Sequence, residues 1–170
     1  RAACEVLGAE VTFLDRIDAE VLADAAIIAR VESELERLRP AALFTLWPVD
    51  RHPDHSAVSE IARKAAGTGE ARCPIVYYES ALSCQVSQFH PDVYVDVTDV
   101  WDEKLRAVRC HDCQNVGDEL AAFTTQQCVF RGWESGCRYA EAFKTTRPLK
   151  MEPDALLAHL AWTRKTYPRF

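Results

Sequence analysis

An apolar run at residues 41–46 is the feature that most limits what this chain can fold into. Segments with apolar residues at helical spacing lie on both sides of it, over residues 19–38 and from Pro53 to about Gly67. A strand without polar alternation is typical of a sheet that is covered on both faces. This helix–strand–helix order therefore favours an α/β domain.

The same alternation continues along the chain. Three further strands are predicted, at residues 11–14, 74–78 and 93–97. Four further helical segments are predicted, at residues 1–8, 101–110, 117–136 and 155–162. Gly8 is expected to end the first of them, and Thr98 or Asp99 is suited to cap the helix that begins near Trp101. From this order we predict a three-layer Rossmann-like α/β domain with a mainly parallel sheet.

The composition supports a globular domain and excludes several classes of protein. Apolar residues make up 48% of the 170 residues and charged residues 27%, which disfavours disorder. No apolar run approaches the ~20 residues that span a bilayer, so we predict no transmembrane segment. The net charge is −6, with an acidic body and a basic segment after residue 143. An acidic body disfavours a phosphate backbone as partner, and we predict no nucleic-acid binding.

The chain has seven cysteines, an odd number scattered along the sequence. This pattern favours reduced thiols in a cytoplasmic protein over a disulfide scaffold. Cys110 and Cys113 form a CxxC motif, which lacks the second pair of a zinc ribbon and falls late in a helical pattern. A thiol-redox protein that uses these two cysteines stays open as an alternative.

The polar loop at residues 47–55 follows the apolar run and carries two histidines and two carboxylates. Ligands of open parallel sheets bind at the carboxyl ends of strands, where this loop is predicted to lie. Imidazole and carboxylate groups are the usual ligands of catalytic zinc. If Pro53 begins a helix, His52 lies just before it and His55 lies in its first turn, while Asp54 can orient a histidine. The spacing alone leaves a metal site and an ordinary helix start equally open, because Asp54 also favours the helix dipole.

Residues 52–55 (HPDH), placed after a buried strand, resemble a motif of the LmbE/PIG-L family of zinc-dependent N-deacetylases. Three other segments are similar to the family's pattern and occur in its order. They are residues 2–9, which end a helix in alanines and Leu-Gly; residues 95–114, with VDVTD, Lys104 and HDCQ; and residues 139–143, YAEAF. The resemblance covers about residues 2 to 147. We therefore expect a deacetylase domain over 1–147 and a C-terminal helix and tail over 148–170.

The resemblance implies a zinc-dependent hydrolase that removes the acetyl group from an N-acetylglucosamine-type amide, with a small N-acetylated amino-sugar conjugate as its partner molecule. His55 matches the zinc-binding histidine of the motif. His52 matches the histidine that stabilises or protonates the tetrahedral intermediate, and Asp54 matches the carboxylate that holds it. Zinc polarises the amide carbonyl and lowers the pKa of bound water toward ~7, and a carboxylate base takes the proton.

The chain departs from the family pattern in two places. The family's remaining zinc ligands and its base lie in an AHPDDE motif on a first strand, and no HPDD occurs in these 170 residues. We expect those ligands upstream of Arg1, which makes the domain N-terminally incomplete and unable to catalyse alone. Cys113 stands where the family usually has serine.

Several other residues of the matched segments have no assigned chemistry. Glu141 and Tyr139 carry the resemblance without a role, and packing is the expected use of His111 and Gln114. His90 and His159 are expected to be structural or surface residues. A non-catalytic binding or assembly protein of the same fold is the alternative function, and a homo-oligomer stays open.

Overall fold

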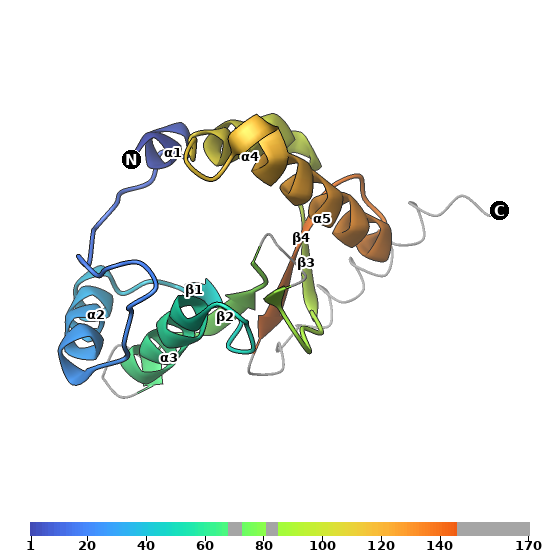
Figure 1. The fold of residues 1–170 in the computed structure, drawn as a ribbon. Helices are drawn as coiled ribbons and strands as arrows, with labels where there is room; N and C mark the ends of the chain where they lie inside the picture. The colour runs from blue at the N-terminus through green and yellow to red at the C-terminus, as the bar shows by residue number, and fades with distance from the viewer. Residues whose placement is uncertain (68–72, 81–84, 146–170) are drawn as a thin grey trace.

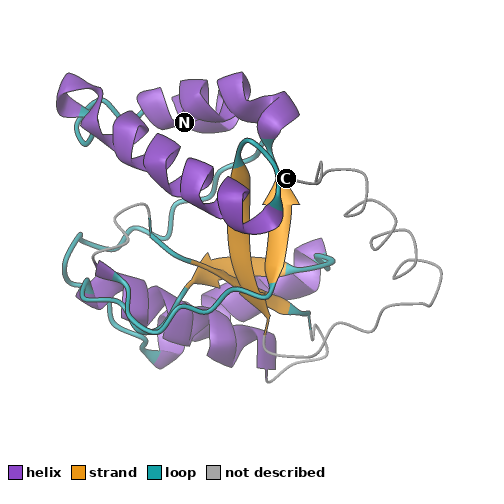
Figure 2. Cartoon of the chain, turned by 90° about the vertical axis from the view of Figure 1, so that its right-hand side faces the viewer, coloured by secondary structure: helices purple, strands orange, loops and turns teal. Residues whose placement is uncertain are grey.

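The computed structural model describes residues 1–67, 73–80 and 85–145 (Figure 1). The helices are α1 (Ala2–Val6), α2 (Ala25–Leu38), α3 (Pro53–Gly67), α4 (Trp101–Arg109) and α5 (Glu119–Ser135), with single 3₁₀ turns before α4 and α5. The strands are β1 (Leu43–Leu46), β2 (Ile75–Tyr78), β3 (Val93–Asp96) and β4 (Ala140–Thr145). Helices lie above and below the strands in the view of Figure 2, so the described residues form a mixed α/β fold.

The four described strands form one sheet in the order β1-β2-β4-β3. β1 and β2 are parallel, whereas β4 is antiparallel to both of its neighbours. The prediction of a mainly parallel sheet is therefore wrong for the described residues. One crossover helix, α3, returns the chain parallel between β1 and β2, but two successive helices separate β3 from β4. The second helix brings the chain back to the end where β3 finished, so β4 runs in the opposite direction.

The segment before α2 differs from its prediction in two ways. Residues 11–14 form no strand, and α2 begins at Ala25 rather than near residue 19. Asp24 caps α2 by accepting a hydrogen bond from the Ile27 backbone N–H at 2.9 Å. Asp15 and Ala19 have positive φ angles of 54° and 65°, which interrupt extended and helical structure alike. The helical spacing of apolar residues extends N-terminal to Asp24, so it does not show where α2 begins.

Most other predicted elements are confirmed within one or two residues. Pro53 begins α3, and Gly8 adopts the left-handed conformation after α1 with φ of 62°. β1 lies within residues 41–46 but is not covered on both faces, since Phe44 is 55% exposed. Thr98 does not cap α4 and instead accepts a hydrogen bond from the Tyr139 backbone N–H. The predicted helix at 155–162 and the tail lie outside the described residues.

Two apolar clusters form the core of the described residues. Leu35 packs with Ala65 and Ala66 between α2 and α3, so small side chains allow close approach of the two helices. The second cluster is centred on Trp101 and Cys128, and the Trp101 ring stacks on Tyr139 at 4.0 Å between centroids. These clusters place α3 behind β1 and α5 behind β4.

Gly132 is required by the close passage of α5 over the turn that follows it. A Cβ atom at this position would lie 2.7 Å from the backbone oxygens of Cys137 and Arg138. The turn begins with Gly136 in the left-handed conformation, with φ of 80°. These two glycines let the chain leave α5 and enter β4 directly.

The described helices are all too short or too polar to cross a membrane. Six cysteines lie in the described part of the chain, and each of them is a free thiol.

Candidate functional site

The loop at residues 47–52 follows β1 and is held by backbone hydrogen bonds on two sides. The Trp47 N–H donates to the carbonyl of Tyr78 at the end of β2, at 2.8 Å. The Arg51 N–H donates to the Gln85 carbonyl at 2.9 Å, and the Ser87 N–H donates to the Val49 carbonyl at 3.0 Å. The loop is therefore built like a short extension of the sheet at the carboxyl ends of the parallel strands.

Asp50 is the centre of this loop, with a side chain that is 1% exposed. Its Oδ1 accepts the backbone N–H of His52 at 2.8 Å, and its Oδ2 accepts the Nδ1–H of His55 at 2.8 Å. Burial would raise the pKa of Asp50, but these two hydrogen bonds and the charge of His55 outweigh it and lower that pKa below 3.8. Asp50 is thus an ionised carboxylate that fixes the orientation of the His55 ring.

His52 and His55 lie face to face at the start of α3. Their ring centroids are 4.6 Å apart and the ring planes differ by 22°. The backbone N–H of Asp54 donates to Nδ1 of His52 at 3.3 Å, so this nitrogen accepts and Nε2 carries the proton of the neutral ring. The structure therefore brings the two predicted histidines together and leaves the Nε2 atom of each as its remaining polar group.

Asp54 is buried, and its carboxylate faces away from this pair. It accepts the backbone N–H groups of Ala19 at 2.7 Å and Val21 at 3.1 Å. Asp50, and not Asp54, is therefore the carboxylate that contacts an imidazole in the described residues. Asp54 ties the segment before α2 to the first turn of α3, and this contact spans 35 residues of sequence.

The remaining sequence-predicted residues lie elsewhere. Tyr139 stacks on Trp101, and Glu141 forms an ion pair with Lys104 of α4. The carbonyl of His111 accepts the backbone N–H of Gln114 in the turn after α4. Cys110 donates its thiol to the Arg106 carbonyl.

A cavity of about 1130 Å³ lies between the sheet and helices α4 and α5. Its wall is mainly apolar, and His111, Lys104 and Glu141 line it. His52 and His55 do not line this cavity, so the paired histidines and the cavity are two separate features.

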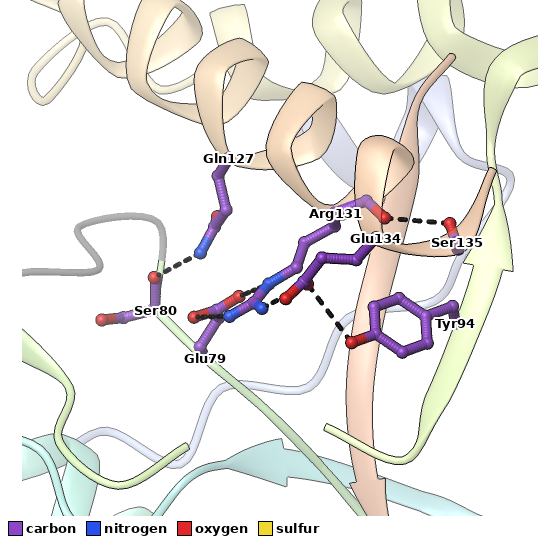
Figure 3. A network of polar contacts seen from close by, with 7 residues as sticks. All are labelled: Glu79, Ser80, Tyr94, Gln127, Arg131, Glu134 and Ser135. Carbon is purple, nitrogen blue, oxygen red and sulfur yellow. Dashed lines mark hydrogen bonds and ion pairs between the residues drawn. The ribbon is translucent and has the colours of Figure 1, made fainter. Parts of the chain in front are cut away.

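A network of charged side chains joins the end of β2 to α5 and β3 (Figure 3). Arg131 donates to both oxygens of Glu79, from Nε at 2.7 Å and from Nη2 at 2.9 Å. Its Nη1 donates to Glu134 at 2.6 Å, and Glu134 also accepts the Tyr94 hydroxyl at 3.2 Å. Burial would lower the pKa of Arg131, but the two carboxylates outweigh it and raise that pKa. Sequence reasoning missed this network because Glu79 and Arg131 are 52 residues apart.

No group of three or more His, Cys, Asp or Glu side chains that could hold a metal ion occurs in residues 1–67, 73–80 and 85–145. His52, His55 and Asp50 thus do not by themselves make up such a group in the described part of the chain.

Comparisons with known proteins agree with the motifs. The model of the family "PIG-L: GlcNAc-PI de-N-acetylase" matches residues 1–66. The chain is 28% identical over 142 residues to a 4-oxalmesaconate hydratase of Pseudomonas putida, a match that covers 77% of the chain. It is 26% identical over 159 residues to a diacetylchitobiose deacetylase of Thermococcus kodakarensis, covering 85% of the chain. These matches cover 54% and 60% of the two relatives, so the chain spans little more than half of their length.

A solved structure shows the same fold. A conserved protein of Thermus thermophilus is 26% identical and superimposes with a TM-score of 0.74, covering 89% of this chain and 72% of that one. The described residues thus have an α/β fold like that of this relative, and residues 1–66 match the PIG-L model. The predicted relationship to the LmbE/PIG-L family is confirmed, since the chain carries the PIG-L match and has deacetylases among its relatives.

Proposed function

We propose that this chain carries part of the active site of a zinc-dependent deacetylase that hydrolyses an N-acetylglucosamine-type amide. The observation that supports it most is the hydrogen bond between Asp50 and Nδ1 of His55. A carboxylate that holds one ring nitrogen fixes the tautomer, so that the lone pair of Nε2 is directed outward for a metal. The deacetylase of Thermococcus kodakarensis supports the reaction class.

The chemistry of the donor set fits zinc. A neutral imidazole with a carboxylate behind it is a common zinc ligand, and His55 would supply it. Zinc supplies a Lewis acid for the amide carbonyl and lowers the pKa of bound water toward ~7. We propose that the other ligands and the base are contributed by parts of the protein outside the described residues.

His52 and Asp54 are proposed to assist from the start of α3. The Asp54 N–H holds Nδ1 of His52, which leaves the Nε2–H to donate a hydrogen bond to the developing oxyanion. The Asp54 carboxylate fastens residues 19–21 to α3 and so keeps this backbone N–H in place. Asp54 is thus proposed to position His52 through its backbone rather than through its carboxylate.

Zinc affinity and acetate release from diacetylchitobiose test this proposal on the natural full-length protein. Replacing His55 by Ala is expected to lower zinc affinity at least ~100-fold and to abolish acetate release, because a direct ligand is lost. His52→Ala is expected to keep zinc but to lower kcat by ~100-fold or more. His111→Ala, which changes a histidine of the separate cavity, is the control. Stoichiometric zinc that survives His55→Ala contradicts the proposal.

A hydratase is the second candidate function, because the P. putida relative has that activity in its name. The same two histidines could move a proton during the addition of water to a carbon–carbon double bond. The two reactions differ in product: a deacetylase releases acetate, whereas a hydratase removes the ultraviolet absorbance of an unsaturated acid. Measuring both on one preparation separates them.

The non-catalytic alternative predicts neither product and no stoichiometric zinc. We further propose a cytoplasmic location, which the scattered free cysteines support. The proposed partner is a small N-acetylated amino-sugar conjugate.

A further inference from the structure

Arg131 of α5 lies far from the histidines in sequence but contacts the end of the strand that adjoins their loop. Its side chain is 10% exposed and the Glu79 side chain is 7% exposed, so this ion pair is shielded from water. Glu79 directly follows β2, and Tyr78 before it accepts the N–H of Trp47, the first residue of the loop. Through Glu79, the guanidinium thus contacts the segment that is hydrogen-bonded to one side of the loop.

The same guanidinium also contacts the segment on the other side of the loop, residues 85–89. Its Cζ atom lies 5.8 Å from the centroid of the Phe89 ring, within cation–π range. Phe89 packs edge-on against Trp47 with centroids 5.7 Å apart, and Trp47 donates its indole N–H to the Ser87 carbonyl. Arg131 therefore contacts both segments between which residues 47–52 run.

Neighbouring side chains of α5 reinforce this contact (Figure 3). Gln127, one turn before Arg131, donates its Nε2–H to the Ser80 carbonyl at 3.1 Å. Glu134, one turn after it, accepts a hydrogen bond from Nη1 of Arg131, and the Tyr94 hydroxyl of β3 also donates to Glu134. Gln127 and Arg131 thus join α5 to the residues after β2, and Glu134 joins it to β3.

We propose that Arg131 is a positioning residue for the histidine loop: it fixes Glu79 and Phe89, and these fix Trp47 and the backbone that carries Asp50, His52 and His55. A buried ion pair adds little net stability compared with apolar packing, so geometry is the function that the pair serves best here. The proposal makes no claim on the identity of the substrate. Only its zinc measurement rests on the proposed function.

The experiment uses the natural full-length protein, called the wild-type chain below, and two kinds of variant. Arg131→Met alone leaves Glu79 buried and charged, so the test pairs it with Glu79→Gln in a double variant that removes both charges. Arg131→Lys keeps the charge but loses the planar fork that binds both Glu79 and Phe89. Arg109→Met is the matched control, because it removes an exposed arginine at the end of α4 that pairs with Asp118.

Two measurements are made on each variant: amide hydrogen exchange by mass spectrometry, and zinc affinity by competition with a chromophoric chelator. In the double variant we expect exchange of residues 47–56 to be ~10-fold faster, while exchange in α2 is unchanged. Zinc affinity is expected to fall ~10-fold, at the lower end of the effect of groups that orient metal ligands. Arg131→Lys is expected to give intermediate values, and Arg109→Met wild-type ones.

Exchange that accelerates equally throughout the chain, or only in α5, overturns the proposal, as does exchange of residues 47–56 within twofold of wild type. If the wild-type chain binds zinc and the double variant keeps the same affinity, the proposal is also overturned. If the wild-type chain binds no zinc, the proposed function loses its support, and hydrogen exchange alone decides on Arg131.

Discussion

The site region (α2, β1, the 47–52 loop and α3) and the clamp region (α4, α5, β3, β4 and Glu79) are held together in different ways. In the site region the contacts among the candidate site side chains are short-range, since Asp50, His52 and His55 lie within six positions of one another. In the clamp region the polar contacts join distant segments, since Glu79 and Arg131 are 52 residues apart and Lys104 and Glu141 are 37 apart. The candidate site residues are thus grouped in one short segment, whereas the ion pairs of the clamp region join segments that are distant in sequence.

The sharpest test of this difference is the loss of one charge from the clamp region. Arg131→Met should lower the free energy of unfolding by about 3–5 kcal/mol, because it leaves the Glu79 carboxylate buried and unpaired. Adding Glu79→Gln should recover part of that loss. Urea unfolding followed by circular dichroism measures both values. A single variant as stable as wild type would show that the ion pair is open to water and does not hold β2.

The next largest effect is expected from Gly132→Ala. The new Cβ would lie 2.7 Å from two backbone oxygens of the α5–β4 turn, so the variant should lose about 1–3 kcal/mol of unfolding free energy. Gly67→Ala is its matched control in α3, because nothing lies within 4 Å of the new atom. Equal melting temperatures for the two variants would mean that β4 does not pass as close to α5 as described.

Asp24→Ala tests a local contact of the site region, the hydrogen bond that caps α2. Losing the cap of α2 should cost about 1 kcal/mol, because the Ile27 N–H loses its acceptor. The effect should be confined to α2, and hydrogen exchange of its first turn measures it. Faster exchange in α5 would contradict the separation of the two regions.

The smallest effect concerns the exposed pair of Arg109 and Asp118. This pair takes no part in the contacts compared above. Hydrogen bonds from Arg109 and Asn115 lower the pKa of Asp118 to about 2. Since the pKa is lower in the folded state, any stabilisation is present above the ordinary value of 3.8 and is lost as the pH falls toward about 2. A carbon-detected NMR titration should give a pKa near 2 in the wild type and a value closer to 3.8 in Arg109→Met. An unchanged value would remove Arg109 as the cause.

The sequence was most informative where local physics decides the structure. Pro53 as a first helical residue and the apolar run before it predicted β1, the loop and α3, with His52 before the helix and His55 in its first turn. The resemblance to the LmbE/PIG-L family agrees with the PIG-L match over residues 1–66. The role of Asp50 could not be predicted, because both Asp50 and Asp54 lie close to the histidines in sequence. Only the tertiary structure shows that Asp50 contacts His55 and that Asp54 does not.

Features that depend on tertiary contacts were predicted poorly. β4 was missed because residues 139–145 mix alanines with charged residues, and their burial comes from strand neighbours distant in sequence. Residues 11–14 have a strand-like composition but run as irregular backbone, with Phe13 bonded through its carbonyl to Arg30 of α2. The Glu79–Arg131 contact has no local signal at all, because a buried salt bridge is defined by the fold.

The central claim is that the site loop presents Nε2 of His55 to a zinc ion while Asp50 holds Nδ1. Anomalous scattering at the zinc edge, measured on crystals of the natural full-length protein grown with zinc, tests it most directly. The account predicts zinc at about 2.0–2.1 Å from Nε2 of His55, with the Asp50 contact kept. Zinc bound at Cys110 and Cys113 with none at His55, or a His55 ring turned away from Asp50, would contradict it.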